Sequence, residues 1–294
     1  MRLEKMLLIT GGSGFVGQNL ARYFAPRRQT VTTYFTHPPT PSPERSIQLD
    51  IRDAEAVFTL LDRERPEAVI HAAGNKNLKV CEDQPDEAFR VNASGTQNVA
   101  RACHRVGAKL IYLSTDLVFS CTKGNYKETD VPKPTLAYGK SKFLGEELAL
   151  DELDNVAVCR SGGIYGKGSP LLQWFAGEIE SGKTVECFID VFKTPTYADN
   201  LGEMMEALLE QKLTGIFHTV GRERVSRLEF FRAYAETLGL DASLLSPVSF
   251  KTLKDTLLLQ PDSSLAIAET ARKLRLTFNS VGEGFTRLQE SGGV

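Results

Sequence analysis

Near the N-terminus the chain reads Thr10-Gly11-Gly12-Ser13-Gly14-Phe15-Val16-Gly17. The apolar residues Met6–Ile9 come before this stretch, and a segment with helical periodicity, Gly17–Tyr23, comes after it. Glycines three residues apart allow a tight turn, a close approach of the backbone to a pyrophosphate, and close packing of a helix on a strand. The backbone N–H groups of the loop and the N-terminus of the helix then face the anion. The stretch therefore predicts a dinucleotide-binding loop between a first strand and a first helix.

Short β-rich runs alternate with longer helical segments over the first 160 residues. We expect strands at Met6–Thr10, Thr30–Phe35, Ala68–Ala72, Lys109–Ser114 and Val156–Arg160. Besides Gly17–Tyr23, helical periodicity covers Ala54–Arg63, Asp86–Val106 and Ser141–Leu150. This alternation favours a parallel sheet that is covered on both faces. The predicted fold class is α/β, with a doubly wound parallel sheet of the Rossmann type.

The 294 residues are enough for two domains, or for one large α/β body. We expect a dinucleotide-binding domain at 1–160 and a smaller α/β part at 161–294, mainly a substrate-binding cap. Within the second part, 190–220 is predicted to return to the main body, because Gly215–Val220 has the pattern of a strand. Helical patterns recur there at Leu201–Glu210, Arg227–Leu238 and Leu265–Leu274.

Composition excludes several classes of partner. The formal net charge is −2 and the pI is about 6.2, which argues against a nucleic-acid clamp or a polybasic membrane binder. No stretch approaches the roughly 20 apolar residues that span a bilayer. The five cysteines never form a CxxC pair, so we expect reduced thiols, no metal site and a cytoplasmic location. The oligomeric state, including a homodimer, is left open.

A tyrosine and a lysine stand one helical turn apart, at Tyr138 and Lys142. A free phenol has a pKa of about 10, so we expect a neighbouring cation to lower it before the tyrosine takes part in proton transfer. Thr115 follows the predicted strand Lys109–Ser114, and open α/β sheets place their sites at the carboxyl ends of strands. We interpret the three residues as a catalytic set in which Thr115 binds and polarises a substrate carbonyl.

The form of the dinucleotide depends on the end of the second strand. The chain there reads Thr33-Tyr34-Phe35-Thr36-His37 and lacks the carboxylate that binds the adenosine ribose of NAD. This absence favours NADP, with NAD as the alternative. Arg27, Arg28 and Arg45 are the candidates for a counter-charge if the fold brings them near. Asp50 and Ile51 are placed to contact the adenine edge, with an exposed helix cap as the alternative.

At this point the chain resembles the extended short-chain dehydrogenase/reductases, and within them the dTDP-4-dehydrorhamnose reductase-like branch. The resemblance covers about residues 5–240. It rests on TGGSGFVG (10–17), Leu49–Ile51, VIHAAG (69–74), RVNASGT (90–96), STDLVF (114–119), YGKSK (138–142), RSGGIYG (160–166) and TPTYADN (194–200).

The resemblance implies a role for each matching residue. Gly11, Gly14 and Gly17 would hold the pyrophosphate, and Ser13, Phe15 and Val16 would line the turn. Asp50 and Ile51 would contact adenine, and Ala72, Ala73 and Gly74 would pass behind the adenosine ribose. Thr115 matches the catalytic hydroxyl, Tyr138 the proton donor and Lys142 its partner, and Asp116 matches a sugar-binding residue. The implied activity is reduction of a carbonyl with NADP or NAD, on a nucleotide-sugar-like substrate with a 4-keto group.

Departures from the family pattern bear on the substrate. Leu117 stands where the nucleotide-sugar 4,6-dehydratases carry a glutamate, so we do not expect dehydratase chemistry. Gly163 stands where the rhamnose reductases place a tryptophan against the sugar, which indicates an altered substrate pocket. Lys79 replaces an aspartate of many relatives, and with Lys76 it suggests an anionic substrate, although two solvated surface lysines are the alternative.

Two other functions stay open at this point. One is a non-catalytic, cofactor-binding regulatory subunit, similar to the β subunit of methionine adenosyltransferase, which belongs to the same branch. The other is an NAD-dependent sugar epimerase, in which a tightly held NAD is reduced and reoxidised in one cycle.

Overall fold

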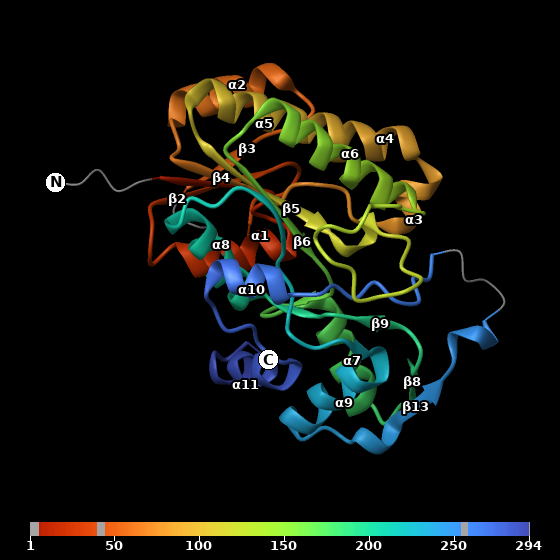
Figure 1. Cartoon of the computed structure of the whole chain (residues 1–294). Helices are drawn as coiled ribbons and strands as arrows, with labels where there is room; N and C mark the ends of the chain where they lie inside the picture. Colours follow the sequence, from red (N-terminus) through yellow and green to blue (C-terminus); the bar gives the residue numbers. More distant parts are fainter. Residues whose placement is uncertain (1–5, 40–44, 254–257, 294) are drawn as a thin grey trace.

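Seven parallel strands form the central sheet of the computed structural model, which describes residues 6–39, 45–253 and 258–293 (Figure 1). In spatial order they are β3 (Ser46–Gln48), β2 (Thr30–Tyr34), β1 (Leu7–Thr10), β4 (Ala68–His71), β5 (Lys109–Thr115), β6 (Val156–Ser161) and β11 (Gly215–His218). The chain leaves β1 first toward one edge and then toward the other, which is the doubly wound arrangement. The predicted α/β fold class is confirmed.

Consecutive residues of the inner strands point to opposite faces of this sheet. In β1, Leu7 and Ile9 pack in one apolar core and Leu8 in the other, and all three are fully buried. The first core is covered by α1 (Phe15–Phe24), α8 (Ala198–Glu210) and α10 (Ala268–Leu274). The second is covered by α2 (Ala54–Glu64), α5 (Gly95–Val106) and α6 (Ala137–Glu152). Strands that are buried on both faces explain the continuous apolar runs in the sequence.

The helix predicted over Asp86–Val106 consists of three parts. After α3 (Leu78–Asp83), the chain forms α4 (Pro85–Phe89), a π-helical turn at Arg90–Ser94, and then α5. The Asn92 amide in this turn donates to the Asn75 carbonyl at 2.9 Å and to Ser141 Oγ at 3.0 Å. Such turns often occur at functional sites, because the extra residue turns a side chain away from the regular helical surface.

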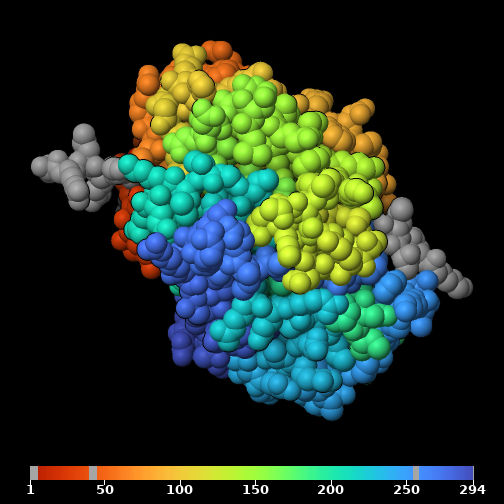
Figure 2. All heavy atoms as spheres, viewed as in Figure 1, coloured from red at the N-terminus to blue at the C-terminus, as the bar shows by residue number. Residues whose placement is uncertain are grey.

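The C-terminal part adds a second layer below the sheet, where Figures 1 and 2 show its blue residues. It contains the helices α7 (Pro170–Glu180), α9 (Arg227–Leu238) and α11 (Val281–Glu290). Three short strand pairs accompany them: β7 (Ile164–Tyr165) with β10 (Thr196–Tyr197), β8 (Val185–Phe188) with β13 (Leu245–Val248), and β9 (Phe192–Lys193) with β12 (Val225–Ser226). Aromatic side chains fill the core of this layer, among them Tyr165, Phe175, Phe230, Phe231 and Phe285.

The two parts are joined by more than one crossing of the chain. Strand β11 pairs in parallel with β6 at the edge of the main sheet, with Ile216 opposite Val158. Helix α8 packs against α1 on the same face. Residues 198–218 therefore lie in the N-terminal body, within the segment 190–220 that is predicted to return to it.

Candidate active site

The glycine-rich loop joins the end of β1 to the start of α1. Gly11 adopts φ +71°, and a Cβ atom there would lie 2.8 Å from the backbone of Ala73. A Cβ at Gly17 would lie 2.1 Å from the Gly11 carbonyl oxygen. Gly14 is the N-cap of α1 and brings no side chain to it, so the positive end of the helix stays open to an anion. This backbone cradle, which side chains would fill, fits the diphosphate of a dinucleotide.

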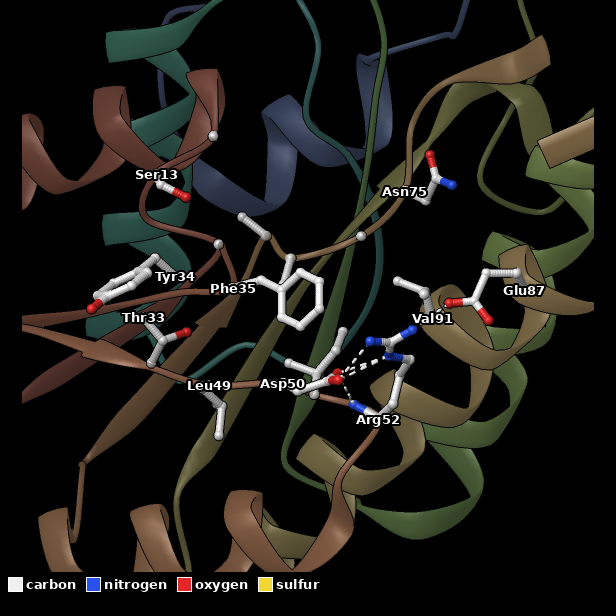
Figure 3. A pocket seen from close by; sticks show the side chains of 16 residues that line it. Ser13, Thr33, Tyr34, Phe35, Leu49, Asp50, Arg52, Asn75, Glu87 and Val91 are labelled. Carbon is white, nitrogen blue, oxygen red and sulfur yellow. Dashed lines mark hydrogen bonds and ion pairs between the residues drawn. The ribbon is translucent and has the colours of Figure 1, made fainter. Parts of the chain in front are cut away.

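A first cavity of about 450 Å³, the adenosine cavity, lies beside this loop (Figure 3). Its lining comes from the ends of the central strands and from α4, with Phe35 and Asp50 on neighbouring segments. Of the predicted cofactor residues, eight line it: Gly11, Ser13, Gly14, Asp50, Ile51, Ala72, Ala73 and Gly74.

A partly exposed cluster of three charged side chains lies on one side of the adenosine cavity. Arg52 donates to both carboxylate oxygens of Asp50, with Nη2 2.6 Å from Oδ2, and its Nη1 lies 2.5 Å from Glu87 Oε1. Hydrogen bonding from Arg52 lowers the pKa of Asp50 below its ordinary value. The guanidinium also lies 5.0 Å from the centre of the Phe35 ring. Arg52 is therefore fully engaged within the cluster.

A second cavity of about 380 Å³, the catalytic cavity, shares Gly11, Gly14 and residues 72–75 with the first. The other predicted residues line it: Phe15, Val16, Gly17, Thr115, Asp116, Tyr138, Lys142 and Gly163. Asn92 from the π-helical turn lines it as well. The structure thus brings the loop and the three predicted catalytic residues to one cleft.

Tyr138 and Lys142 lie in the first two turns of α6. Lys142 Nζ donates to the Leu113 carbonyl at 2.8 Å and lies 4.1 Å from the centre of the Tyr112 ring. Burial lowers the pKa of Lys142 to about 7, and the nearby Glu146 carboxylate acts in the opposite direction. This lysine therefore changes charge close to neutral pH.

The pKa of Tyr138 is raised above its ordinary value, which is opposite to the predicted direction. Burial is the largest cause, while hydrogen bonding with Thr115 acts against it. Asp116 adds to the rise in the pKa, and Lys142 is not among its causes; the Lys142 ammonium donates to the Leu113 carbonyl. Near neutral pH, Tyr138 is therefore a protonated phenol, the form that a proton donor requires.

Thr115 and Asp116 form a hydrogen-bonded unit at the end of β5. Thr115 Oγ1 donates to Asp116 Oδ1 at 3.0 Å. The other carboxylate oxygen of Asp116 accepts from Ser263 Oγ at 2.5 Å and from Lys193 Nζ at 3.3 Å. Asp116 is buried, so these donors hold its carboxylate in place.

A buried ion pair supports this region from below. The Arg160 guanidinium on β6 donates to both oxygens of Glu146, with Nη2 2.6 Å from Oε2. Ser114 Oγ donates to the same carboxylate. Glu146 lies one helical turn after Lys142, so the pair links α6, which carries Tyr138 and Lys142, to β6 and, through Ser114, to β5, which ends at Thr115.

A third cavity of about 190 Å³ opens next to Gly163. Lys193, which also lines the catalytic cavity, and Arg227 at the start of α9 bring two cations to it. Burial lowers the pKa of Arg227. Sequence reasoning missed both residues, since no local pattern places them near Thr115. Lys79, which it did single out, pairs with Asp83 on the surface of α3 and lies outside these cavities, whereas Lys76 lines the catalytic cavity.

Disulfides, metal-binding groups and membrane-spanning helices are absent from the described residues. All five cysteines are unbridged, and no three His, Cys, Asp or Glu side chains in residues 6–39, 45–253 and 258–293 gather in a metal-binding group. Over those same ranges, every helix is too short or too polar to cross a membrane.

The open parallel sheet and the glycine-rich loop define a protein of the Rossmann class. The profile of the family described as RmlD substrate binding domain matches residues 5–288, and the chain belongs to this family. The predicted resemblance to the dTDP-4-dehydrorhamnose reductase-like branch is confirmed.

The relatives include named reductases and a named subunit. The chain is 32% identical over 247 residues to the "Probable low-salt glycan biosynthesis reductase Agl14" of Haloferax volcanii, with 81% of each chain covered. It is 29% identical to "Methionine adenosyltransferase 2 subunit beta" of Mus musculus, over 84% of this chain and 76% of that one. Among solved structures, dTDP-4-dehydrorhamnose reductase from Bacillus anthracis in complex with NADP superposes with a TM-score of 0.86 at 25% identity, covering 98% of this chain and 100% of that one.

Proposed function

We propose that the chain is a nicotinamide-dinucleotide-dependent reductase that converts a carbonyl group, the 4-keto group of a nucleotide-linked sugar, to an alcohol. One observation carries the proposal: Thr115, Tyr138 and Lys142 line the cavity that continues from the phosphate-binding loop. The names of the relatives support it, because Agl14 and the Bacillus anthracis protein are described as reductases.

The chain's own residues divide the binding of the dinucleotide between the two adjoining cavities. Gly11 and Gly14 would hold the diphosphate, Asp50 and Ile51 the adenine, and Lys142 a ribose hydroxyl of the nicotinamide half. When bound, the nicotinamide supplies a hydride for the carbonyl carbon of the substrate. What remains for the protein is to deliver a proton to the carbonyl oxygen.

Tyr138 is placed to deliver that proton. Its phenol is protonated at neutral pH, and the hydroxyl of Thr115 shares hydrogen bonding with it. Thr115, whose hydroxyl donates to Asp116 in this structure, would turn that proton to the carbonyl oxygen of a bound substrate and orient the oxygen toward the phenol. After the transfer, the Lys142 ammonium in the same cavity would stabilise the phenolate.

The third cavity suggests where the rest of the substrate binds. Arg227 faces the Phe231 ring at 5.8 Å, and Lys193 pairs with Asp116. Two cations beside the catalytic cavity fit the diphosphate of a nucleotide-linked sugar. Gly163 lies between the two cavities without a side chain, which leaves space near the sugar. A different sugar from that of the rhamnose reductases is consistent with this space.

The test is the substitution Tyr138→Phe. We expect it to lower turnover with NADH or NADPH and a 4-keto nucleotide sugar by about 100- to 10,000-fold, with nearly unchanged dinucleotide affinity. Tyr234→Phe in the C-terminal core is the matched control and should keep its activity. Undiminished turnover in the Tyr138→Phe variant would contradict the assignment.

The second candidate is a non-catalytic regulatory subunit. The similarity to methionine adenosyltransferase 2 subunit beta favours it, because that relative matches 84% of this chain. Stable co-purification with another enzyme, together with no oxidation of NADH or NADPH over a panel of carbonyl compounds, would favour this function over the reductase.

A further inference from the structure

The adenosine cavity carries few charges. Among its described lining residues, only Asp50, Arg52 and Glu87 are charged, and the sum of two carboxylates and one guanidinium is −1. Phe35 and Tyr34, at the end of β2 where the adenosine ribose of a Rossmann ligand binds, have no charge to offer. The side of the cavity that would meet a 2′-phosphate is therefore neutral to negative.

Arg52 is not free to act as a counter-charge. Its Nε and Nη2 are held by Asp50, and its Nη1 is held by Glu87, as the dashed lines and side chains of Figure 3 show. Asp50 forms a bidentate pair with one side of the guanidinium, and Glu87 binds the remaining side. The positive charge of Arg52 is therefore neutralised within the cluster. To bind a phosphate, Arg52 would have to give up one of these carboxylates.

The three arginines named as candidates for a counter-charge do not line the adenosine cavity. Arg27 lies over the Tyr23 ring and near Glu206, Arg28 near Glu67, and Arg45 donates to Glu64. Each pairs with a carboxylate outside the lining of the adenosine cavity, which keeps it from this site. After Phe35 the sequence up to Glu44 contains no lysine or arginine.

We propose that the protein binds NAD(H) in preference to NADP(H), with Glu87 and Asp50 as the discriminating residues. The inference rests on the proposed function, since it concerns the dinucleotide of the same site. A 2′-phosphate carries close to two negative charges and would lose hydration beside a cluster of net charge −1 that offers no free cation in return. The hydroxyl of NAD at that position is neutral and meets no such cost.

Fluorescence titration of the purified chain with NADH and with NADPH tests this without any carbonyl substrate. We expect NADH to bind at least about tenfold more tightly. Raising the salt concentration should reduce the difference in affinity between NADH and NADPH, because screening weakens the repulsion of the 2′-phosphate.

The variant Glu87→Gln tests whether Glu87 is responsible for the preference for NADH over NADPH. It removes one carboxylate and loosens the hold on Arg52, so we expect NADPH affinity to rise by about fivefold while NADH affinity changes little. Asp86→Asn is the matched control: it makes the same charge change on the same helix, but Asp86 is exposed and lies outside the cavity lining, so the ratio should stay as in the unmodified chain.

The outcomes separate the two proposals. If NADPH binds as tightly as NADH or more tightly, the preference is overturned while the reductase proposal stands. If Asp86→Asn shifts the ratio as much as Glu87→Gln, the role of Glu87 is overturned. If neither dinucleotide binds, the proposed function fails, and the preference fails with it.

Discussion

At the scale of single residues, burial sets the chemistry of the site more than pairing does. Tyr138 and Lys142 both move away from their charged forms, because each lies in a cleft that disfavours charge. The phenol then stays protonated, while the lysine, with a pKa of about 7, keeps its charge only in neutral and acidic solution.

Reduction should therefore slow as the pH rises through about 7. In the proposed mechanism, Lys142 loses its proton there and can no longer stabilise the phenolate that remains after Tyr138 has donated its proton. Glu146 raises the pKa of Lys142, so Glu146→Gln should move this decline to lower pH. The measurement is kcat against pH, with Glu147→Gln, an exposed neighbour, as the control.

Because Glu146 also pairs with the buried Arg160, the fold of the variant is checked by its thermal unfolding. If the folded Glu146→Gln variant loses activity at the same pH as the unmodified chain, Glu146 does not raise the pKa of Lys142.

At the scale of elements, the loop before α1 depends on backbone space. The carbonyl of Gly11 lies so close to Gly17 that any side chain at position 17 displaces it, and the same loop is the proposed phosphate cradle. Dinucleotide binding and the packing of α1 therefore both require that position 17 has no side chain.

Gly17→Ala should reduce stability by about 1–3 kcal/mol and weaken dinucleotide binding strongly, because overpacking shifts the loop. Gly177→Ala is the matched control in α7. A Cβ at Gly177 meets nothing within 4 Å, so that change should be neutral or stabilising by up to about 1 kcal/mol. Chemical denaturation and dinucleotide titration measure both effects, and equal behaviour of the two variants would refute this account of the loop.

At the scale of the whole molecule, the lower layer has its own aromatic core. The Phe285 ring on α11 lies 4.8 Å from Tyr165 and 5.0 Å from Tyr234, centre to centre, and is fully buried. This core supports the third cavity through Tyr165, whereas the adenosine cavity is built by the upper body.

Phe285→Ala should cost about 3–5 kcal/mol of stability, which is usual for a buried phenylalanine. We expect dinucleotide affinity to persist under folding conditions and substrate affinity to fall. Urea unfolding and the two affinities are the measurements, with Val131→Ala, at a residue 73% exposed, as a control that should stay within about 0.5 kcal/mol. A loss of both affinities together would mean that the two layers do not act separately.

The sequence alone determined the features that depend on local pattern. Gly11, Gly14 and Gly17 predicted the phosphate loop, because strand, turn and helix follow one another within a dozen residues. The i, i+4 spacing of Tyr138 and Lys142 predicted one helical face, and alternating apolar runs predicted the parallel sheet.

Only the tertiary structure decided what depends on segments far apart in the chain. Lys193 and Ser263 meet Asp116 across 77 and 147 residues, and no periodicity encodes such contacts. The same holds for charge: Arg52 is neutralised by Glu87, 35 residues away, and Arg45 is drawn to Glu64. Even the direction of the Tyr138 pKa shift follows from burial, a property of the assembled cleft. Local geometry is written in neighbouring residues, whereas electrostatics depends on everything that the fold packs around a group.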